Sequence, residues 1–338
     1  MTETTPPEST STDREARIDA FLAAAGWAGA MRRPLAGDAS FRRYQRLADG
    51  DRTAVLMDAP PAHEEVRPFV AVDRYLAGRG YSVPAILAAD EDAGLLLLED
   101  LGDDLFDALL PDNADETTLY AGAIDLLIDL HAEPPTGLDV PPYDDARMLD
   151  EVCRLLDWYM PAIAGTRPDD GCRAAFTGAW RAVLPLARAV PEGLVLMDYH
   201  APNLIWLPDR QGLARVGLLD FQDATIGPLA YDVVSLLEHP RRDVAQATVT
   251  AMKARYLAGR PEIDRGAFSA AYAVLGAQRN TRIAGTFARL WKRDGKAGYL
   301  DHLPRVWRLL EGNLAHPALA PVKAWFDGFV PADKRGRP

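Results

Sequence analysis

The stretch LMDYHAPNLIWL, residues 196–207, places three polar side chains between two apolar runs. Asp198, His200 and Asn203 stand in the short segment DYHAPN, and another acid, Asp220, ends the later apolar run VGLLD. Asp, Pro and Asn are ordinary turn residues, so DYHAPN by itself is also typical of a hydrogen-bonded turn. Phosphoryl transfer gives a second interpretation, because it needs a carboxylate to accept a hydroxyl proton and oxygen ligands for a divalent metal. The flanking apolar runs and the turn PDRQG predict short strands that return Asp220 beside DYHAPN.

The composition limits the class of protein. The chain has 338 residues, of which 48% are hydrophobic, and this length favours about two domains. Lys and Arg number 37 against 49 Asp and Glu, a net charge of −12 that argues against a broad nucleic-acid-binding surface. The two cysteines form neither a zinc spacing nor a disulfide scaffold. The start MTETTPPESTST resembles no signal peptide, and no apolar run reaches the roughly 20 residues that cross a bilayer. We expect a cytoplasmic monomer without nucleic-acid or membrane partners.

Residues 13–102, after a disordered tail over 1–12, are predicted to be mainly strands with few helices. Thr12 and Glu15 have the spacing of a capping box at the start of a helix that Gly26 would end. SFRRYQRL and TAVLMDAP, joined by ADGD, predict a hairpin, and PAILAAD and GLLLLED predict another. Between the two hairpins, Pro68 opens a segment with apolar residues at helical spacing.

The pattern changes at Gly102, beyond which residues 103–338 are predicted to be mainly helical. Apolar residues recur at helical spacing over 116–131, 146–160, 173–189, 244–258, 267–290 and 301–312. Between the third and fourth of these segments lie the short apolar runs LVLM, NLIWL and ARVGLLD, which predict strands. The fold class is therefore α+β, with a small strand-rich part followed by a larger helical part.

The segment from Asp198 to Asn203 resembles the D-x-H-x-x-N pattern of the aminoglycoside phosphotransferase family, whose members are related to the protein kinases. LLDFQDATIGPLAYD resembles the metal-binding acid of that family and the loop after it. The resemblance implies a bilobal protein-kinase-like fold with a nucleotide-binding N-lobe and a catalytic, substrate-binding C-lobe. It implies that Asp198 is the catalytic base, that Asn203 and Asp220 bind Mg²⁺, and that Asp223 lies nearby in support. Asp232 would brace the loop and the following helix from within.

The same resemblance identifies a nucleotide site for ATP. GDASFRRY takes the place of the loop over the phosphates, where Gly37 permits close backbone approach and Ser40, Arg42 or Arg43 offers hydrogen-bond donors. LLLLEDLGD takes the place of the hinge, where backbone groups from Glu99 to Leu101 would hydrogen-bond adenine. An exposed, charged edge strand is the ordinary alternative for GDASFRRY. The sequence does not fix ATP over GTP.

Two features depart from the wider superfamily. Its pattern has His and Gly before the catalytic acid, where this chain has Leu196 and Met197. The strand that carries a phosphate-binding lysine in kinases reads TAVLMDAP, which contains no lysine. We hypothesise that Arg43, and with it Arg42, supplies the missing charge, because guanidinium binds phosphate oxygens in bidentate fashion.

Six blocks in order are similar to the anomeric kinases that phosphorylate N-acetylmuramate and N-acetylglucosamine at C1. They are GDASFRRY, VLMDAPP, LLLLEDLGD, DYHAPNLIWL, LLDFQDA and QRNTRIAGTFARL. The resemblance implies an amino-sugar substrate, a sugar 1-phosphate product and a place in bacterial peptidoglycan recycling. A hemiacetal hydroxyl is more acidic than an ordinary alcohol, which suits an aspartate base.

Substrate contacts are less defined. Arg279 and Arg282, three residues apart on a predicted helix, can bind the carboxylate of a sugar acid, but a solvated helix face fits them equally. Arg241 and Arg242 are further candidates. For His200 we favour a bracing hydrogen bond over proton transfer.

Other functions stay open at this point. A kinase for an aminoglycoside, homoserine or choline has the same fold, and the charge of −12 suits a cationic antibiotic. A metal-dependent hydrolase built from Asp198, His200, Asp220 and Asp223 needs no nucleotide. A nucleotide binder without catalysis would explain the missing lysine but leaves the base and the metal ligands without a use.

Overall fold

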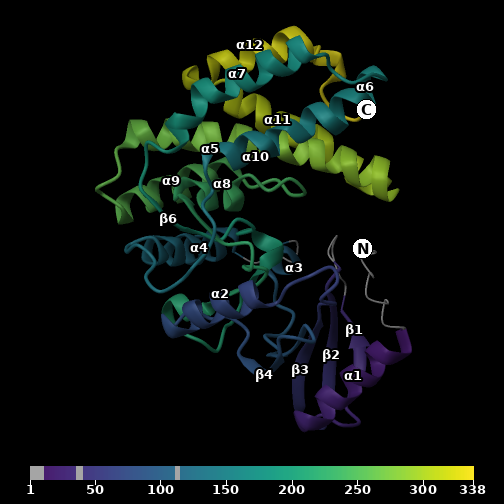
Figure 1. Ribbon diagram of the computed structural model, residues 1–338. Helices are drawn as coiled ribbons and strands as arrows, with labels where there is room; N and C mark the ends of the chain where they lie inside the picture. The colour runs from purple at the N-terminus through teal and green to yellow at the C-terminus, as the bar shows by residue number, and fades with distance from the viewer. Residues whose placement is uncertain (1–10, 36–40, 111–114) are drawn as a thin grey trace. The chain divides into compact units, whose positions relative to one another are not determined.

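The computed structural model describes residues 11–35, 41–110 and 115–338. The chain forms two compact units (Figure 1). The first contains the chain up to Asp103 together with Gly217–Gln222, and the second contains Asp104–Val216 and Asp223–Pro338. The segment that carries Asp220 therefore belongs to the first unit, although it lies far along the chain.

The first unit contains a five-stranded antiparallel sheet in the order β1-β2-β3-β5-β4. Its strands are β1 (Met31–Pro34), β2 (Arg43–Asp49), β3 (Arg52–Asp58), β4 (Ile86–Asp90) and β5 (Leu95–Glu99). Both predicted hairpins are confirmed, and Gly50 turns the first with a φ of 60°. Sequence patterning missed β1, because its residues MRRP are largely exposed and show no apolar alternation.

Two helices complete the first unit. The helix α1 (Ser11–Ala24) begins one residue before the predicted Thr12, so Thr12 lies inside the helix and the predicted cap position was wrong. Apolar residues of α1 and the sheet form one buried cluster, which includes Ile18, Leu22, Trp27, Leu47, Leu56 and Leu97. The helix α2 (Arg67–Gly78) has Pro68 in its first turn, as predicted.

The second unit is mainly helical. Its helices are α3 (Phe106–Leu109), α4 (Glu116–Leu130), α5 (Asp145–Arg154), α6 (Met160–Ala164), α7 (Asp170–Ala187), α8 (Ala230–Leu237), α9 (Gln246–Gly259), α10 (Arg265–Asp294), α11 (Leu303–Leu314) and α12 (Ala320–Phe329). A π-helical turn, Leu155–Tyr159, continues α5 into α6. The long helix α10 contacts α5, α7, α8 and α11 and is the central packing element of this unit (Figure 1). The six predicted helical segments are confirmed, whereas α3, α8 and α12 were not predicted.

Short strands interrupt these helices. They are β6 (Glu192–Val195), β7 (Leu204–Trp206), β8 (Val216–Leu218) and β9 (Thr225–Pro228). The strands β6 and β9 pair antiparallel, with Val195 opposite Thr225. This pairing places the chain that leaves β6, beginning at Leu196, beside the helix α8 that follows β9. Within the described residues, no helix has the length and apolar character needed to cross a membrane.

Candidate active site

The turn that leads into Asp198 is held by a buried carboxylate. After β6 the backbone enters a left-handed conformation at Met197, with a φ of 68°. Asp232 of α8 is fully buried and accepts hydrogen bonds from the Leu196 amide at 2.7 Å and the Met197 amide at 3.0 Å. The Ser235 hydroxyl donates to the Met197 carbonyl at 3.0 Å. The first turns of α8 thus fix the backbone that presents Asp198.

A histidine lies behind this carboxylate. His131, at the end of α4, places its Nε2 3.9 Å from Asp232 Oδ2 and its Nδ1 2.9 Å from the Tyr256 hydroxyl. Burial lowers the pKa of His131, although Asp232 opposes the shift. His131 therefore stays neutral at physiological pH and is a packing and hydrogen-bonding partner of the brace.

The loop after Asp198 is fixed at three points. The Asn203 amide nitrogen donates to the Asp198 carbonyl at 3.0 Å, and the Asn203 backbone amide donates to the His200 carbonyl at 2.8 Å. The Tyr199 hydroxyl donates to the Ala123 carbonyl of α4 at 2.7 Å. Asp198 and Asn203 are both half-buried. The structure thus brings the predicted base and one predicted metal ligand together on a rigid loop.

His200 contacts another histidine that the sequence did not single out. The rings of His200 and His239 lie 5.0 Å apart in an edge-on arrangement. Burial lowers the pKa of His239 to about 2, with His200 and Arg279 adding to the shift. His239 is therefore neutral, and His200 packs against a neutral ring.

The two predicted substrate arginines differ in environment. Arg279 is buried and donates to the Glu238 carbonyl at 3.0 Å, which is a structural contact within α10 and α8. Arg282 keeps 16% of its side chain exposed, donates to the Tyr231 hydroxyl at 3.0 Å and lies 3.6 Å from Glu151. Burial lowers the pKa of Arg282, but this effect is outweighed by nearby groups that include Tyr231, Glu151 and Asp198. The pKa of Arg282 is therefore raised well above its usual value. Arg282 is thus a cation within electrostatic range of Asp198.

Asp220 lies in the first unit, in a segment anchored by an aromatic contact. Phe221 is buried and stacks on Phe69 of α2 with ring centroids 4.9 Å apart. The Leu218 amide donates to the Ser82 carbonyl at 2.8 Å. Asp220 itself is exposed, has a φ of 56° and accepts a hydrogen bond from Gln222 at 2.8 Å.

A charged cluster on the same unit includes Asp220. Arg42, just before β2, forms an ion pair with Glu64 at 3.2 Å. Burial is the main cause that raises the pKa of Tyr44 to about 12. The positive charge of Arg42 opposes this shift, whereas the negative charges of Asp220 and Glu64 add to it. Tyr44, Arg42, Glu64 and Asp220 therefore interact electrostatically in one place. Arg43 is exposed and opposes Asp58 across the β2–β3 ladder.

The lysine-free strand β3 ends in an internal ion pair. Asp58 is buried and accepts from the Arg14 Nε at 2.9 Å, while the Arg14 guanidinium also donates to the Ala93 carbonyl at 2.6 Å. Arg14 thereby ties α1 to the sheet. The acid in β3 is explained by this contact.

The predicted hinge follows β5. The Glu99 amide donates to the Ala85 carbonyl at 2.8 Å, and Leu101 is half-buried. Arg46 holds the next residues through ion pairs to Asp100 at 2.9 Å and Asp103 at 2.7 Å. Gly37 and Ser40 lie outside the described residues.

The residues present fit a Mg²⁺ ion that takes only a few ligands from the protein and the others from substrate phosphates and water. Within residues 11–35, 41–110 and 115–338, no group of three or more His, Cys, Asp or Glu side chains is gathered as a metal site. Mg²⁺ commonly takes only one or two protein oxygens and completes its shell with phosphates and water. Asn203 turns its amide nitrogen to the Asp198 carbonyl, so its Oδ1 faces elsewhere, and Asp220 is an exposed carboxylate. Asp223, the remaining predicted acid, is exposed just before β9 in the second unit.

The residues missed by sequence reasoning are Tyr44, Glu64 and His239. Tyr44 ends the motif GDASFRRY but was not singled out, and Glu64 lies in a stretch with no recognised motif; only the fold brings Glu64 to Arg42 and Tyr44. His239 follows the unpredicted helix α8, and its proximity to Arg241, already a candidate, was the available signal.

Comparisons with known proteins identify the family of the chain. The model of the phosphotransferase enzyme family matches residues 32–268. An N-acetylmuramate/N-acetylglucosamine kinase from Caulobacter vibrioides is 41% identical over 360 residues, covering 96% of this chain and 99% of the relative. A protein of the same name from Pseudomonas aeruginosa is 39% identical over 295 residues, covering 85% of each chain.

A solved structure supports the fold. A putative aminoglycoside phosphotransferase from Ralstonia eutropha superposes with a TM-score of 0.64 at 16% identity, covering 92% of this chain and 98% of that one. The predicted α+β, protein-kinase-like fold is thereby confirmed. At this identity the likeness concerns the fold alone.

Proposed function

The chain belongs to the phosphotransferase enzyme family, and from this premise we propose that it is an ATP-dependent sugar kinase acting at the anomeric C1 hydroxyl of N-acetylmuramate and N-acetylglucosamine. One observation carries the substrate class: a kinase named for these two sugars is 41% identical and is covered over 99% of its length. The product would be a sugar 1-phosphate. We further propose that this reaction belongs to peptidoglycan recycling in the cytoplasm and that the enzyme acts as a monomer.

We assign the role of general base to Asp198. A base that takes the hydroxyl proton must be held within hydrogen-bond reach of it, and the backbone on both sides of Asp198 is fixed by hydrogen bonds. Arg282 provides a cation within electrostatic range of this carboxylate. His200 is assigned a bracing role through its contact with His239.

We assign Asn203 and Asp220 as the residues that would hold magnesium. When bound, Mg²⁺ bridges the nucleotide phosphates and neutralises charge that develops during transfer. The hydrogen bond from Asn203 to the Asp198 carbonyl couples the orientation of the amide to that of the base. We assign Asp223 a supporting role and propose that backbone groups from Glu99 to Leu101 bind adenine at the end of β5.

For the cation that replaces the kinase lysine we favour Arg42 over Arg43. In kinases the phosphate-binding lysine is oriented by a glutamate of the helix after it. Arg42 pairs with Glu64, which precedes α2, and interacts through Tyr44 with the proposed metal ligand Asp220. Arg43 is not among the residues whose charges affect the pKa of Tyr44, so Tyr44 does not link it to Asp220. Gly37 and Ser40 keep their proposed place in the loop over the phosphates.

The test combines product analysis with one substitution. The protein is incubated with magnesium ATP and a panel that contains both amino sugars, an aminoglycoside, choline and homoserine, and phosphorus NMR identifies the phosphorylated atom. We expect a sugar 1-phosphate, whose phosphorus couples to the anomeric proton. Another phosphorylated compound, or phosphate at another sugar position, would replace the proposal.

The substitution is Asp198→Asn. Loss of a general base costs about 10²- to 10⁴-fold in turnover, while the nucleotide should still raise the thermal midpoint, because Asp198 is not assigned to nucleotide binding. Asp209→Asn, in the exposed turn PDRQG, is the matched control. Equal turnover by Asp198→Asn and the control would exclude Asp198 as the base.

A further inference from the structure

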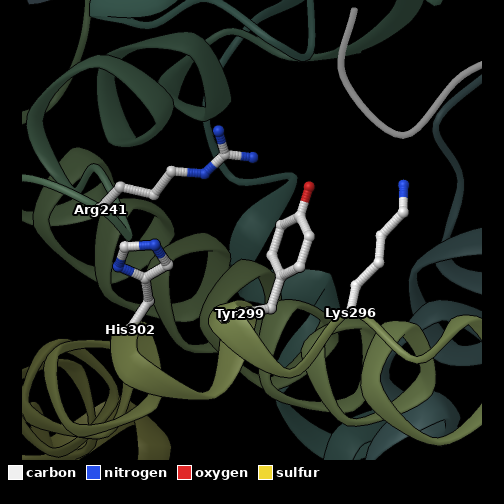
Figure 2. A pocket seen from close by; sticks show the side chains of 5 residues that line it. Arg241, Lys296, Tyr299 and His302 are labelled. Carbon is white, nitrogen blue, oxygen red and sulfur yellow. The ribbon is translucent and has the colours of Figure 1, made fainter.

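A cationic pocket lies in the second unit, between the segment after α8 and the short helix Ala297–His302. It has a volume of about 260 Å³ and is lined by Arg241, Lys296, Gly298, Tyr299 and His302. Figure 2 shows the guanidinium of Arg241, the hydroxyl of Tyr299 and the ammonium of Lys296 directed to the same open side. These five lining residues include two cationic side chains and no carboxylate. The pocket therefore attracts anions.

Aromatic packing holds the lining in place. The Arg241 guanidinium carbon lies 5.4 Å from the centre of the Tyr299 ring. Beneath it, Phe287 of α10 contacts the Tyr299 ring at 5.2 Å and the His302 ring at 6.0 Å. Tyr299 and His302 thus pack on a side chain of α10 and Arg241 packs on Tyr299, which reduces the entropy lost when a ligand binds.

Among the described residues, three carboxylates close in sequence to the lining residues form ion pairs with arginines outside the pocket. The pairs are Asp243 with Arg305 at 3.0 Å, Asp294 with Arg293 at 2.6 Å and Asp301 with Arg337 at 3.0 Å. All three acids have a cation of their own within the surrounding surface.

Contacts within the second unit join the pocket to the loop of Asp198. The Arg241 backbone amide donates to His239 Nδ1 at 3.3 Å. The His239 ring in turn lies 5.0 Å from the ring of His200, which follows shortly after Asp198 in DYHAPN. The segment that carries Arg241 is therefore joined to the loop of the proposed base through one histidine pair.

We propose that this pocket binds the carboxylate of an anionic sugar acceptor, the lactyl group of N-acetylmuramate, while its anomeric hydroxyl faces Asp198. The proposal rests on the sugar kinase function proposed above. N-acetylmuramate carries a lactyl ether with a carboxylate at O3, where N-acetylglucosamine has a plain hydroxyl. The fork of Arg241 matches a carboxylate, Lys296 adds a point charge, and Tyr299 adds a neutral donor.

The arginines expected from the sequence fit this role less well. Arg279 is buried against the Glu238 carbonyl, and Arg282 is paired with Glu151. An oxyanion in the pocket could also be a nucleotide phosphate, which offers the same chemistry. Kinetics with each substrate separate these two sources.

The experiment uses the full chain with Arg241→Gln and Lys296→Gln combined. Steady-state kcat/KM is measured for N-acetylmuramate and for N-acetylglucosamine, and KM is measured for ATP. Because both side chains are exposed, removal of the two charges should lower the ratio of kcat/KM for N-acetylmuramate over N-acetylglucosamine by about tenfold. Arg241→Lys combined with Lys296→Arg keeps both charges and should restore most of that ratio. Lys323→Gln, on the exposed face of α12, removes one charge elsewhere and should leave the ratio unchanged.

Each outcome decides between distinct conclusions. An unchanged ratio, including equal losses on both sugars, overturns the carboxylate pocket while the kinase function stands. A rise in the KM for ATP with an unchanged sugar ratio assigns the pocket to a phosphate instead. Wild-type protein that phosphorylates N-acetylglucosamine but not N-acetylmuramate also overturns the pocket alone. Wild-type protein that phosphorylates neither sugar overturns the proposed function, and the assignment of this pocket with it.

Discussion

Asp232 offers the sharpest test of how the fold positions the proposed base. Its carboxylate is fully buried and accepts the amides of Leu196 and Met197 at 2.7 and 3.0 Å. Asp232→Ala removes both acceptors and leaves two buried N–H groups without a partner. The backbone that presents Asp198 then loses the contacts that hold its left-handed turn.

The cost follows from the number of bonds that are lost. Hydrogen bonds to a charged group contribute about 1.5–3 kcal/mol each, so Asp232→Ala should cost about 3–6 kcal/mol. Asp232→Asn keeps one acceptor and sets an amide NH₂ against the other backbone N–H, so about half of that loss is expected. With an m value of about 3 kcal/mol per molar urea, the urea midpoint of Asp232→Ala should fall by about 1–2 M.

The assay is urea denaturation followed by fluorescence and circular dichroism, together with kcat at a temperature where the variants stay folded. Asp209→Ala, an exposed acid in the turn PDRQG, is the control and should shift stability by no more than about 0.5 kcal/mol. Turnover should fall in both Asp232 variants, because the base loses its fixed position. A variant Asp232→Ala with the wild-type midpoint and wild-type kcat would refute the bracing role.

Three further substitutions test other parts of the structure. In Gly285→Ala the new Cβ would lie 2.3 Å from the Arg154 backbone carbon, so the free energy of unfolding from urea denaturation should fall by about 1–3 kcal/mol. Gly178→Ala lies in the middle of a helix with open space around it and should raise the free energy of unfolding by about 0.5–1 kcal/mol. Burial raises the pKa of Asp73 to about 7. The negative charge of Asp73 therefore destabilises the fold fully above about pH 7 and not at all below about pH 4. Asp73→Asn should raise the urea midpoint at pH 8 but not at pH 4. Arg42→Ala should raise the KM for ATP about tenfold or more and Arg43→Ala much less, and the reverse order would restore Arg43 as the phosphate ligand.

Local patterns in the sequence were sufficient for most elements of the fold. The turn ADGD and the apolar strands beside it determine the first hairpin, and the helical spacing of apolar residues determines α4 and α10. Patterning failed where an element is buried or exposed on all sides. Every residue of α8 is buried, so it has no polar face to reveal a helical period, and β1 is too exposed to show alternation.

The proposed site was less accessible from sequence, because its electrostatics depend on contacts between distant residues. The acids and the amide of DYHAPN and LLDFQD became candidates because these segments resemble motifs of the family. The choice between Arg42 and Arg43 depends instead on Glu64 and Tyr44, which only the folded sheet brings together. The same holds for Arg14, whose ion pair with Asp58 accounts for an acid in a strand where kinases have a lysine.

The departure at Met197 also has a physical explanation. Among the described residues other than glycine, only Met197 and Asp220 have a positive φ, and both lie at the proposed catalytic segments. The superfamily pattern has glycine at the first of these positions, where a left-handed residue with a side chain costs about 1–2 kcal/mol. Met197 is 2% exposed, and burial of its side chain contributes about 1.5–3 kcal/mol, which offsets the strain. Glycine would relieve the strain but lose that burial. The hydrogen bonds of Asp232 and Ser235 and the buried methionine together maintain a turn for which the superfamily pattern has glycine.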